Sequence, residues 1–210
     1  TFNIKLIKNK NNLGFSKAVN IGIKYALENG ADRILLLNPD TKIESGFIQP
    51  LVENTADIVS PVIKFKRDNK WVYDFGGRVN WNIGRTKHLE YIKRAPLAIL
   101  QGVPLITDYV SGCCMLIKRQ VFEKIGLFDE RFFMYFEDAD FCIRAKKAGF
   151  NIEVEPKSMI IHNLLEDEKR SDIKKYHLIV SNFHFINKYL GIKRLFGYLY
   201  LLGMIAKMNL

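Results

Sequence analysis

Apolar residues recur along this chain at two spacings, one typical of helices and one typical of buried strands. Over residues 16–29 they follow a helical period, which predicts a helix that ends near Gly30. The continuous apolar run RILLL at 33–37 predicts a buried strand, and a shorter apolar segment at 4–7 predicts another. The order strand, helix, strand favours a parallel sheet with right-handed crossovers.

The pattern continues in the second half of the chain, beyond a loop-rich stretch at 64–107 that it does not assign. The further elements expected from it are strands at 57–63, 109–118, 151–156 and 158–163, helices at 119–126 and within 128–150, and a helical tail from 171 to 210. These elements predict an α/β domain over 1–165, with a mixed, mainly parallel sheet flanked by helices. A basic, amphipathic helical extension is expected over 166–210.

Composition sets only a few limits on the partners and the location of the protein. The chain has 210 residues, 48% of them hydrophobic, and a formal net charge of +10, so an anionic partner is expected. Its three cysteines have no CxxC spacing, which suits a reducing compartment better than disulfides or zinc. The apolar run at 195–206 is too short to span a bilayer. We therefore expect a cytoplasmic protein that is soluble or peripheral on the cytoplasmic face of the membrane.

The sequence lacks the motifs of several common enzyme classes. The chain has no GxGxxG, no GxxxxGK[ST] and no GxSxG. Their absence argues against dinucleotide dehydrogenases, P-loop enzymes and hydrolases with a nucleophile elbow. The basic residues are scattered and form no known nucleic-acid-binding motif. Nucleic acid is thus not an expected partner.

Two groups of carboxylates and one histidine are candidates for chemistry. Asp40 follows the strand at 33–37 in the run LLLNPDT, where open parallel sheets bind ligands, although Asn-Pro-Asp-Thr is also an ordinary turn. Glu137 and Asp138 open a predicted helix, where Asp138 suits both a cap and a general base. His162 closes a strand, where a histidine is either structural or a ligand.

A polar loop before the first helix is a further candidate. In NNLGFSKAVN (11–20), Asn11, Asn12 and Gly14 precede a helix N-terminus, which favours a phosphate or another polar ligand. The same residues also suit an ordinary loop and cap. Cys113 and Cys114 lie in an apolar strand and are expected in the core.

Taken in order, these segments resemble a known family. NLGFSKAVNIGIKYA, LLLNPDT, SGCCMLIKR and FDERFFMYFEDADFCIRAKKAGF, followed by the histidine of MIIHN, are similar to the family 2 glycosyltransferases with a GT-A fold. The likeness is to the rhamnosyltransferase-like branch and covers about residues 4–165. It implies a Rossmann-like GT-A sheet and inverting transfer of a sugar from a nucleotide-diphosphate donor, such as a UDP- or dTDP-sugar. The acceptor would be a saccharide or a lipid-linked hydroxyl in cell-surface polysaccharide or glycolipid synthesis.

The resemblance also implies roles for single residues. Asp40 would bind a divalent cation, Mg²⁺ or Mn²⁺, and His162 would complete that metal site. Asp138 would be the catalytic base, with Glu137 beside it. The residues implied in donor binding are Gly14, Phe15, Ala18, Asn20, Asn38 and Asp40. Ser111 and Gly112 match the segment that faces the sugar and the acceptor.

The family normally opens with a strand, a helix and a second strand that hold the nucleobase and ribose. This sequence begins near the third strand of the expected fold, so the chain is expected to lack that N-terminal part. The alternative hypothesis is a truncated, non-catalytic remnant that binds a partner or a membrane surface.

Overall fold

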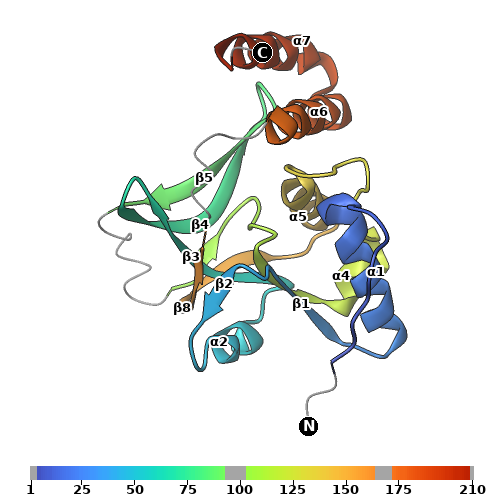
Figure 1. Cartoon of the computed structure of the whole chain (residues 1–210), viewed down its shortest axis with the longest axis vertical. Coiled ribbons are helices and arrows are strands. Elements are labelled where there is room, and N and C mark those ends of the chain that lie inside the picture. Colours follow the sequence, from blue (N-terminus) through green and yellow to red (C-terminus); the bar gives the residue numbers. More distant parts are fainter. Residues whose placement is uncertain (1–3, 93–102, 164–171, 209–210) are drawn as a thin grey trace.

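The computed structural model describes residues 4–92, 103–163 and 172–208. These residues form a mixed sheet flanked by helices, with two further helices stacked beyond one end of it (Figure 1). In chain order the elements are α1 (Gly14–Glu28), β1 (Arg33–Leu37), β2 (Thr41–Ile43), α2 (Ile48–Glu53), β3 (Ile58–Arg67), β4 (Lys70–Asn80), β5 (Arg85–Tyr91), β6 (Leu105–Ile106), β7 (Cys114–Lys118), α4 (Arg119–Ile125), α5 (Glu137–Lys147), β8 (Ile152–His162), α6 (Asp172–Tyr189), a 3₁₀ turn η1 (Gly191–Lys193) and α7 (Arg194–Lys207).

The neighbouring strands β1 and β7 alternate their side chains between two apolar layers. Ile34 of β1 and Ile117 of β7 pack in the main core with α1, α4 and α5. Leu35 and Leu116, one position away, face the opposite side, where they pack against α2 around Leu51. Because side chains of a strand point alternately to its two faces, a continuous apolar run is what a strand covered on both sides requires.

The mixed sheet is as predicted, but its strands are not mainly parallel. Among the described strands the order runs β1-β7-β3-β4-β5, and only the pairing of β3 with β8 is parallel. One reason is that β3, β4 and β5 are joined by short turns, and hairpin-linked strands must be antiparallel. The first of these turns is Asp68-Asn69, both with φ near +50° (48° and 57°), as two-residue hairpins favour.

Three element predictions are wrong or incomplete. Residues 4–7 form no strand, and Ile4 is 92% exposed, because no described strand pairs with this segment. The segments at 151–156 and 158–163 form one strand, β8, with an irregular register opposite Pro61 and Val62. The strand expected at 109–118 starts only at Cys114, and the residues before it form a loop that faces the site.

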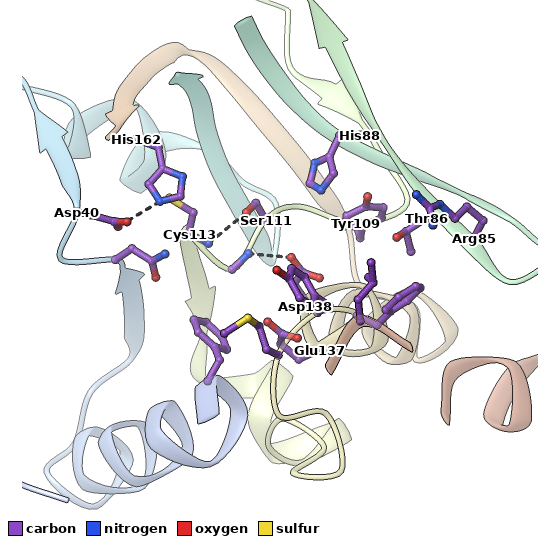
Figure 2. Close-up of a pocket in the computed structure, with 17 residues that line it drawn as sticks. Asp40, Arg85, Thr86, His88, Tyr109, Ser111, Cys113, Glu137, Asp138 and His162 are labelled. Atoms are coloured by element: carbon purple, nitrogen blue, oxygen red, sulfur yellow. Dashed lines mark hydrogen bonds and ion pairs between the residues drawn. The ribbon is translucent and has the colours of Figure 1, made fainter. Parts of the chain in front are cut away.

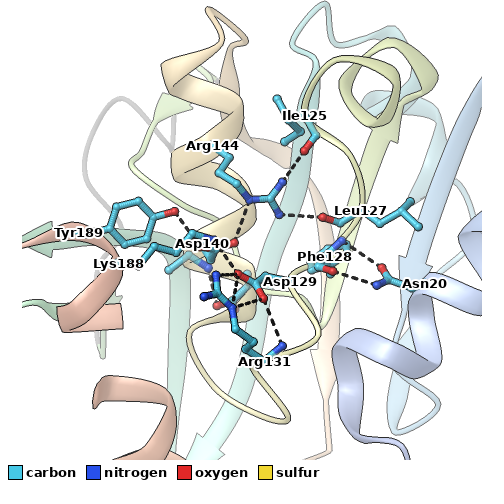
Figure 3. Close-up of polar contacts among 12 residues, drawn as sticks. Asn20, Ile125, Leu127, Phe128, Asp129, Arg131, Asp140, Arg144, Lys188 and Tyr189 are labelled. Atoms are coloured by element: carbon cyan, nitrogen blue, oxygen red, sulfur yellow. Dashed lines mark hydrogen bonds and ion pairs between the residues drawn. The ribbon is translucent and has the colours of Figure 1, made fainter. Parts of the chain in front are cut away.

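The two C-terminal helices are fixed to the rest of the molecule. Leu178 and Phe185 of α6 belong to the main core. A buried charge network joins α6 to α5: Asp140, fully buried, accepts hydrogen bonds from Arg144 (2.9 Å) and from the hydroxyl of Tyr189 (2.7 Å) (Figure 3). Lys188 of α6 also pairs with Asp140 at 2.6 Å. Helix α6 is therefore held against the helix that carries Asp138.

Candidate functional site

A cavity of about 550 Å³ opens above the ends of β1 and β7. Figure 2 shows its two sides: Asp40 and His162 lie on one, and β5 with Arg85, Thr86 and His88 lies on the other. Glu137 and Asp138 lie between them, at the start of α5. The cavity therefore collects side chains from segments far apart in the sequence.

Backbone pairing brings Asp40 and His162 together. Strand β2 pairs with the end of β8, with Thr41 opposite His162, and the amide of Asn163 donates to the carbonyl of Asp40 at 2.8 Å. His162 Nε2 then lies 3.1 Å from Asp40 Oδ1. The carboxylate is 46% exposed and the imidazole 16% exposed, so both reach the cavity while their backbones are held.

A tight loop presents Asp138 and Glu137. Tyr135 and Phe136 both have positive φ, 71° and 66°, and turn the chain sharply into α5. Such backbone conformations are costly for large side chains and persist where the surroundings hold them. The carboxylates lie in the first turn of α5, where the helix dipole favours negative charge.

The segment before β7 is bonded directly to Asp138. The amide of Gly112 donates to Asp138 Oδ2 at 3.1 Å. A Cβ on Gly112 would lie 2.9 Å from the ring of Phe15 and 3.7 Å from Cβ of Asp138, so this position has no room for a side chain. Ser111 lines the cavity beside it and accepts from the amide of Cys113 at 3.2 Å.

Burial shapes the acidity of the two carboxyls of α5. Burial and the charge of Asp138 raise the pKa of Glu137. Burial also raises the pKa of Asp138, although the charge of His88 and the amide of Gly112 oppose this. Raised carboxyl pKa values are typical of proton-transfer sites, since a base works best when its pKa is close to the working pH.

The residues predicted to bind the donor divide into two groups. Phe15, Asn38 and Asp40 line the cavity. Gly14, Ala18 and Asn20 are not among the residues that line it. The buried amide of Asn20 bonds instead to the backbone of Phe128, donating at 2.9 Å and accepting at 3.0 Å. For these three residues a donor-binding role stays a prediction.

The β5 side of the cavity is missing from the sequence-based predictions. Arg85, Thr86 and His88 come from a stretch that periodicity left unassigned, and Tyr109 was expected in a strand. Two signals were available. KFKRDNKWVYDF has a polar Asp-Asn turn between two alternating runs, which is typical of a hairpin. The second run carries an aspartate, Asp74, among apolar residues, and a carboxylate in such a run requires a partner on a neighbouring strand.

The chemistry of Asp40 and His162 fits a divalent cation. Carboxylate oxygen suits Mg²⁺ and Mn²⁺, and Mn²⁺ also accepts imidazole nitrogen. Within the described ranges no group of three or more histidine, cysteine, aspartate or glutamate side chains is close enough to hold an ion. Asp40 and His162 alone would leave the coordination of a cation incomplete, so such a cation would need further ligands. Both cysteines expected in the core, Cys113 and Cys114, are buried and free.

Comparisons with known proteins show the family and the fold of the chain. The sequence model described as Glycosyl transferase family 2 matches residues 1–126. A hexosyltransferase of low-salt glycan biosynthesis from Haloferax volcanii, Agl10, is 28% identical over 92% of this chain and 62% of its own length. The dTDP-rhamnosyl transferase RfbF of Shigella flexneri is 26% identical over 84% of this chain and 61% of its own length. The chain thus spans about three fifths of the length of these relatives.

The fold also has a counterpart among solved structures. The crystal structure of GalNAc-T7 with UDP, GalNAc and Mn²⁺ superposes with a TM-score of 0.60 over 83% of this chain and 35% of that one. The two sequences are 17% identical, so the likeness concerns the fold, which is of the GT-A type.

Proposed function

This chain belongs to glycosyl transferase family 2, and from that premise we propose that it transfers a sugar from a nucleotide-diphosphate sugar to a hydroxyl group, with inversion at the anomeric carbon. One observation carries the proposal. A single cavity holds Asp40 and His162, whose side chains contact each other at 3.1 Å, and a separate carboxylate, Asp138, whose pKa is raised. Sugar transfer requires both, one for the leaving diphosphate and one for the proton of the acceptor.

Asp40 and His162 are the residues that would hold Mg²⁺ or Mn²⁺. When bound, such a cation offsets the negative charge that develops on the leaving diphosphate. Asn38 and Phe15 line the same side of the cavity and would contact the donor there. The solved structure of similar fold contains UDP and Mn²⁺ together, which supports this choice of ligands.

Asp138 would act as the general base. Its carboxylate accepts the proton of the acceptor hydroxyl as the hydroxyl oxygen forms the new bond to the anomeric carbon, and the bond to the diphosphate breaks. The Gly112 amide fixes one carboxylate oxygen, and the loop through Phe136 fixes the start of the helix. Glu137 lies beside it, buried, and its charge would oppose a second charge on Asp138.

The relatives support a donor and an acceptor class. One is named a dTDP-rhamnosyl transferase, and a third relative, from Mycobacterium tuberculosis, is an N-acetylglucosaminyl-diphospho-decaprenol L-rhamnosyltransferase, 27% identical over 77% of this chain. We propose a dTDP- or UDP-sugar as donor, a saccharide or lipid-linked acceptor, and a role in cell-surface polysaccharide or glycolipid synthesis.

A lipid-linked acceptor would bring the protein to the cytoplasmic face of a membrane. Among the described helices, none has the length and apolarity to cross a bilayer. Helix α7 does expose one apolar face, and Lys193 and Arg194 lie at its start. The exposed side chains of this face are Leu195, Phe196, Leu199 and Leu202, all at least 58% exposed. We propose that this face lies on an anionic lipid surface, with the cations near the headgroups.

Donor binding and turnover test the proposal. The chain is incubated with a panel of UDP- and dTDP-sugars and MnCl₂, and its melting temperature and nucleotide release are measured. At least one donor is expected to raise the melting temperature in a cation-dependent way and to be consumed when an acceptor glycolipid is added. No stabilisation by any donor would overturn the proposal. Stabilisation without turnover would replace it with the non-catalytic alternative.

A further inference from the structure

An ion pair between His88 and the buried carboxylate of Asp74 forms part of the β5 side of the cavity. His88 Nδ1 lies 2.8 Å from Asp74 Oδ2. Asp74 is 6% exposed, and its other oxygen accepts a hydrogen bond from the amide of Gly76 at 2.9 Å. A buried carboxylate without a partner is strongly unfavourable, so this pair keeps one nitrogen of the His88 ring turned toward β4.

The second support of the His88 ring is Tyr109. The two rings meet edge to face, with centroids 5.2 Å apart. Tyr109 is in turn held by β4, since its carbonyl accepts from the Gly77 amide at 2.8 Å. A Cβ on Gly77 would lie 2.2 Å from the Tyr109 ring, which shows how closely the backbone of β4 covers this side chain. The position of His88 is therefore fixed on two sides.

The charged groups around His88 are mostly acidic. Asp74 comes from β4, Glu90 from β5 and Asp138 from α5. Burial lowers the pKa of His88, but the contact with Asp74 and the charges of all three carboxylates outweigh it and raise the pKa to about 9. His88 is thus an imidazolium at neutral pH, and it lines the same cavity as Asp138. In Figure 2 its ring reaches into the cavity on the side opposite Glu137, with Asp138 between them.

The groups around Asp138 show why a cation is needed there. Glu137 and Cys142 lie on the same helix, Asp74 on β4, and Tyr109 in the segment before β7. All of these are anionic when ionised. A nucleotide diphosphate would bring further negative charge into the cavity. The charges of Asp74 and of the diphosphate disfavour an ionised Asp138, whereas burial raises the pKa of Tyr109 and Cys142 and keeps both neutral.

We propose that His88, held by Asp74, is a positioning residue that keeps Asp138 ionised while the donor is bound. This rests on the proposed function, because it assigns His88 to the base of that reaction. The role requires an imidazolium fixed in the cavity wall and close enough to act on Asp138. The ion pair with Asp74 supplies the charge, and the packing against Tyr109 supplies the fixed position.

Histidine NMR tests the pair without any substrate. The Cε1–H signals of the 4 histidines are titrated, and His88 is assigned by its loss in His88→Gln. In the wild-type chain the His88 signal is expected to titrate near pH 9, well above the ordinary 6.5. In Asp138→Asn its midpoint is expected to fall while the other histidines keep theirs. A wild-type midpoint near 6.5, or no change in Asp138→Asn, would overturn the proposal.

The pH profile of transfer tests the consequence. His88→Gln is expected to lose about tenfold in kcat near pH 6 and to approach the wild type above pH 9, where His88 itself loses its charge. His88→Lys restores part of the loss, and the donor KM changes little. The control is His184→Gln on α6, which lies outside the cavity. An equal loss of kcat at every pH, or a change confined to the donor KM, would show a merely structural role.

The two tests also separate this proposal from the proposed function. If no donor supports transfer, the proposed function fails, and the NMR titration still decides the His88–Asp138 interaction.

Discussion

His162 Nε2 lies 3.1 Å from Asp40 Oδ1, although 122 residues separate the two in the chain. The contact depends on one short backbone pairing, that of β2 with the end of β8. Three residues of β2 thus bring the aspartate of an ordinary Asn-Pro-Asp turn and a strand-terminal histidine into one unit, which we propose binds a cation.

Removing either member of this unit is expected to weaken cation binding. Asp40→Asn and His162→Gln should each lower Mn²⁺ affinity in the presence of the donor nucleotide by at least about tenfold, because the two supply the chain's proposed share of the coordination. Electron paramagnetic resonance of free Mn²⁺ measures this directly. Asp172→Asn, an exposed aspartate at the start of α6, is the control and should bind Mn²⁺ as the wild type does. Unchanged Mn²⁺ affinity in both variants would remove them as ligands.

Asp138→Asn is expected to lower kcat by about 10²–10⁴-fold, since the amide accepts no proton from the acceptor hydroxyl. Donor affinity should stay within about threefold of the wild type, because the proposed cation pair is untouched. Initial rates and calorimetric donor titrations separate the two quantities. Full turnover in Asp138→Asn would assign the base to another group.

Glu137→Gln is expected to make the protein more stable at pH 8. The folded-state pKa of Glu137 is raised by burial and by Asp138, so the folded state binds a proton more tightly than the unfolded chain. Stability therefore falls as the pH rises above the ordinary value of 4.5, and a neutral amide avoids that loss. Urea unfolding at pH 4 and pH 8 measures it. The difference between variant and wild type should be small at pH 4 and positive at pH 8; a variant less stable than wild type only at pH 8 would contradict the sign.

Gly77→Ala is expected to destabilise the fold by about 2–4 kcal/mol, because the new Cβ would overlap the Tyr109 ring. Gly22→Ala is a matched control: it lies in α1, with nothing within 4 Å of a new Cβ. It should gain about 0.5–1 kcal/mol from better helix propensity. Thermal unfolding of the two variants should therefore move in opposite directions, and equal effects would count against the close packing at Gly77.

Leu199→Glu is expected to reduce binding to vesicles that contain phosphatidylglycerol by roughly tenfold, because it places a charge in the exposed apolar face of α7. Val52→Glu, in α2 near the other end of the molecule (Figure 1), is the control and should bind like the wild type. Flotation measures both. Equal binding by the two variants would separate α7 from any lipid contact.

Much of this could be predicted from the sequence, but only where the pattern was local. The helix before Asn29 and the strand at 33–37 follow from spacing and apolar content, and α1 and β1 lie there. The carboxylates and the histidine could be named as candidates because each ends or opens such an element. Their meeting in one cavity depends on strand pairing across the chain, which periodicity does not report.

The limit of prediction from the sequence is clearest for the β5 side of the cavity. His88 and Tyr109 carry no motif, and each is an unremarkable residue in its own stretch of sequence. Their roles arise from a hairpin turn, a register irregularity between Asp74 and Gly77, and a glycine with no room for a side chain. The apolar segment at 4–7 shows the opposite error, because local content suggested a strand where no partner strand exists among the described residues.

The network around Asp140 gives the C-terminal helices a mechanical link to the site (Figure 3). Asp140 is two residues from Asp138 on the same helix, and it is bonded to Tyr189 and Lys188 at the end of α6, next to the turn into α7. These contacts therefore connect the end of α6, where the chain turns into α7, with the helix that carries Asp138. The helix proposed to lie on a lipid surface and the helix that carries the proposed base thus share one network of polar contacts.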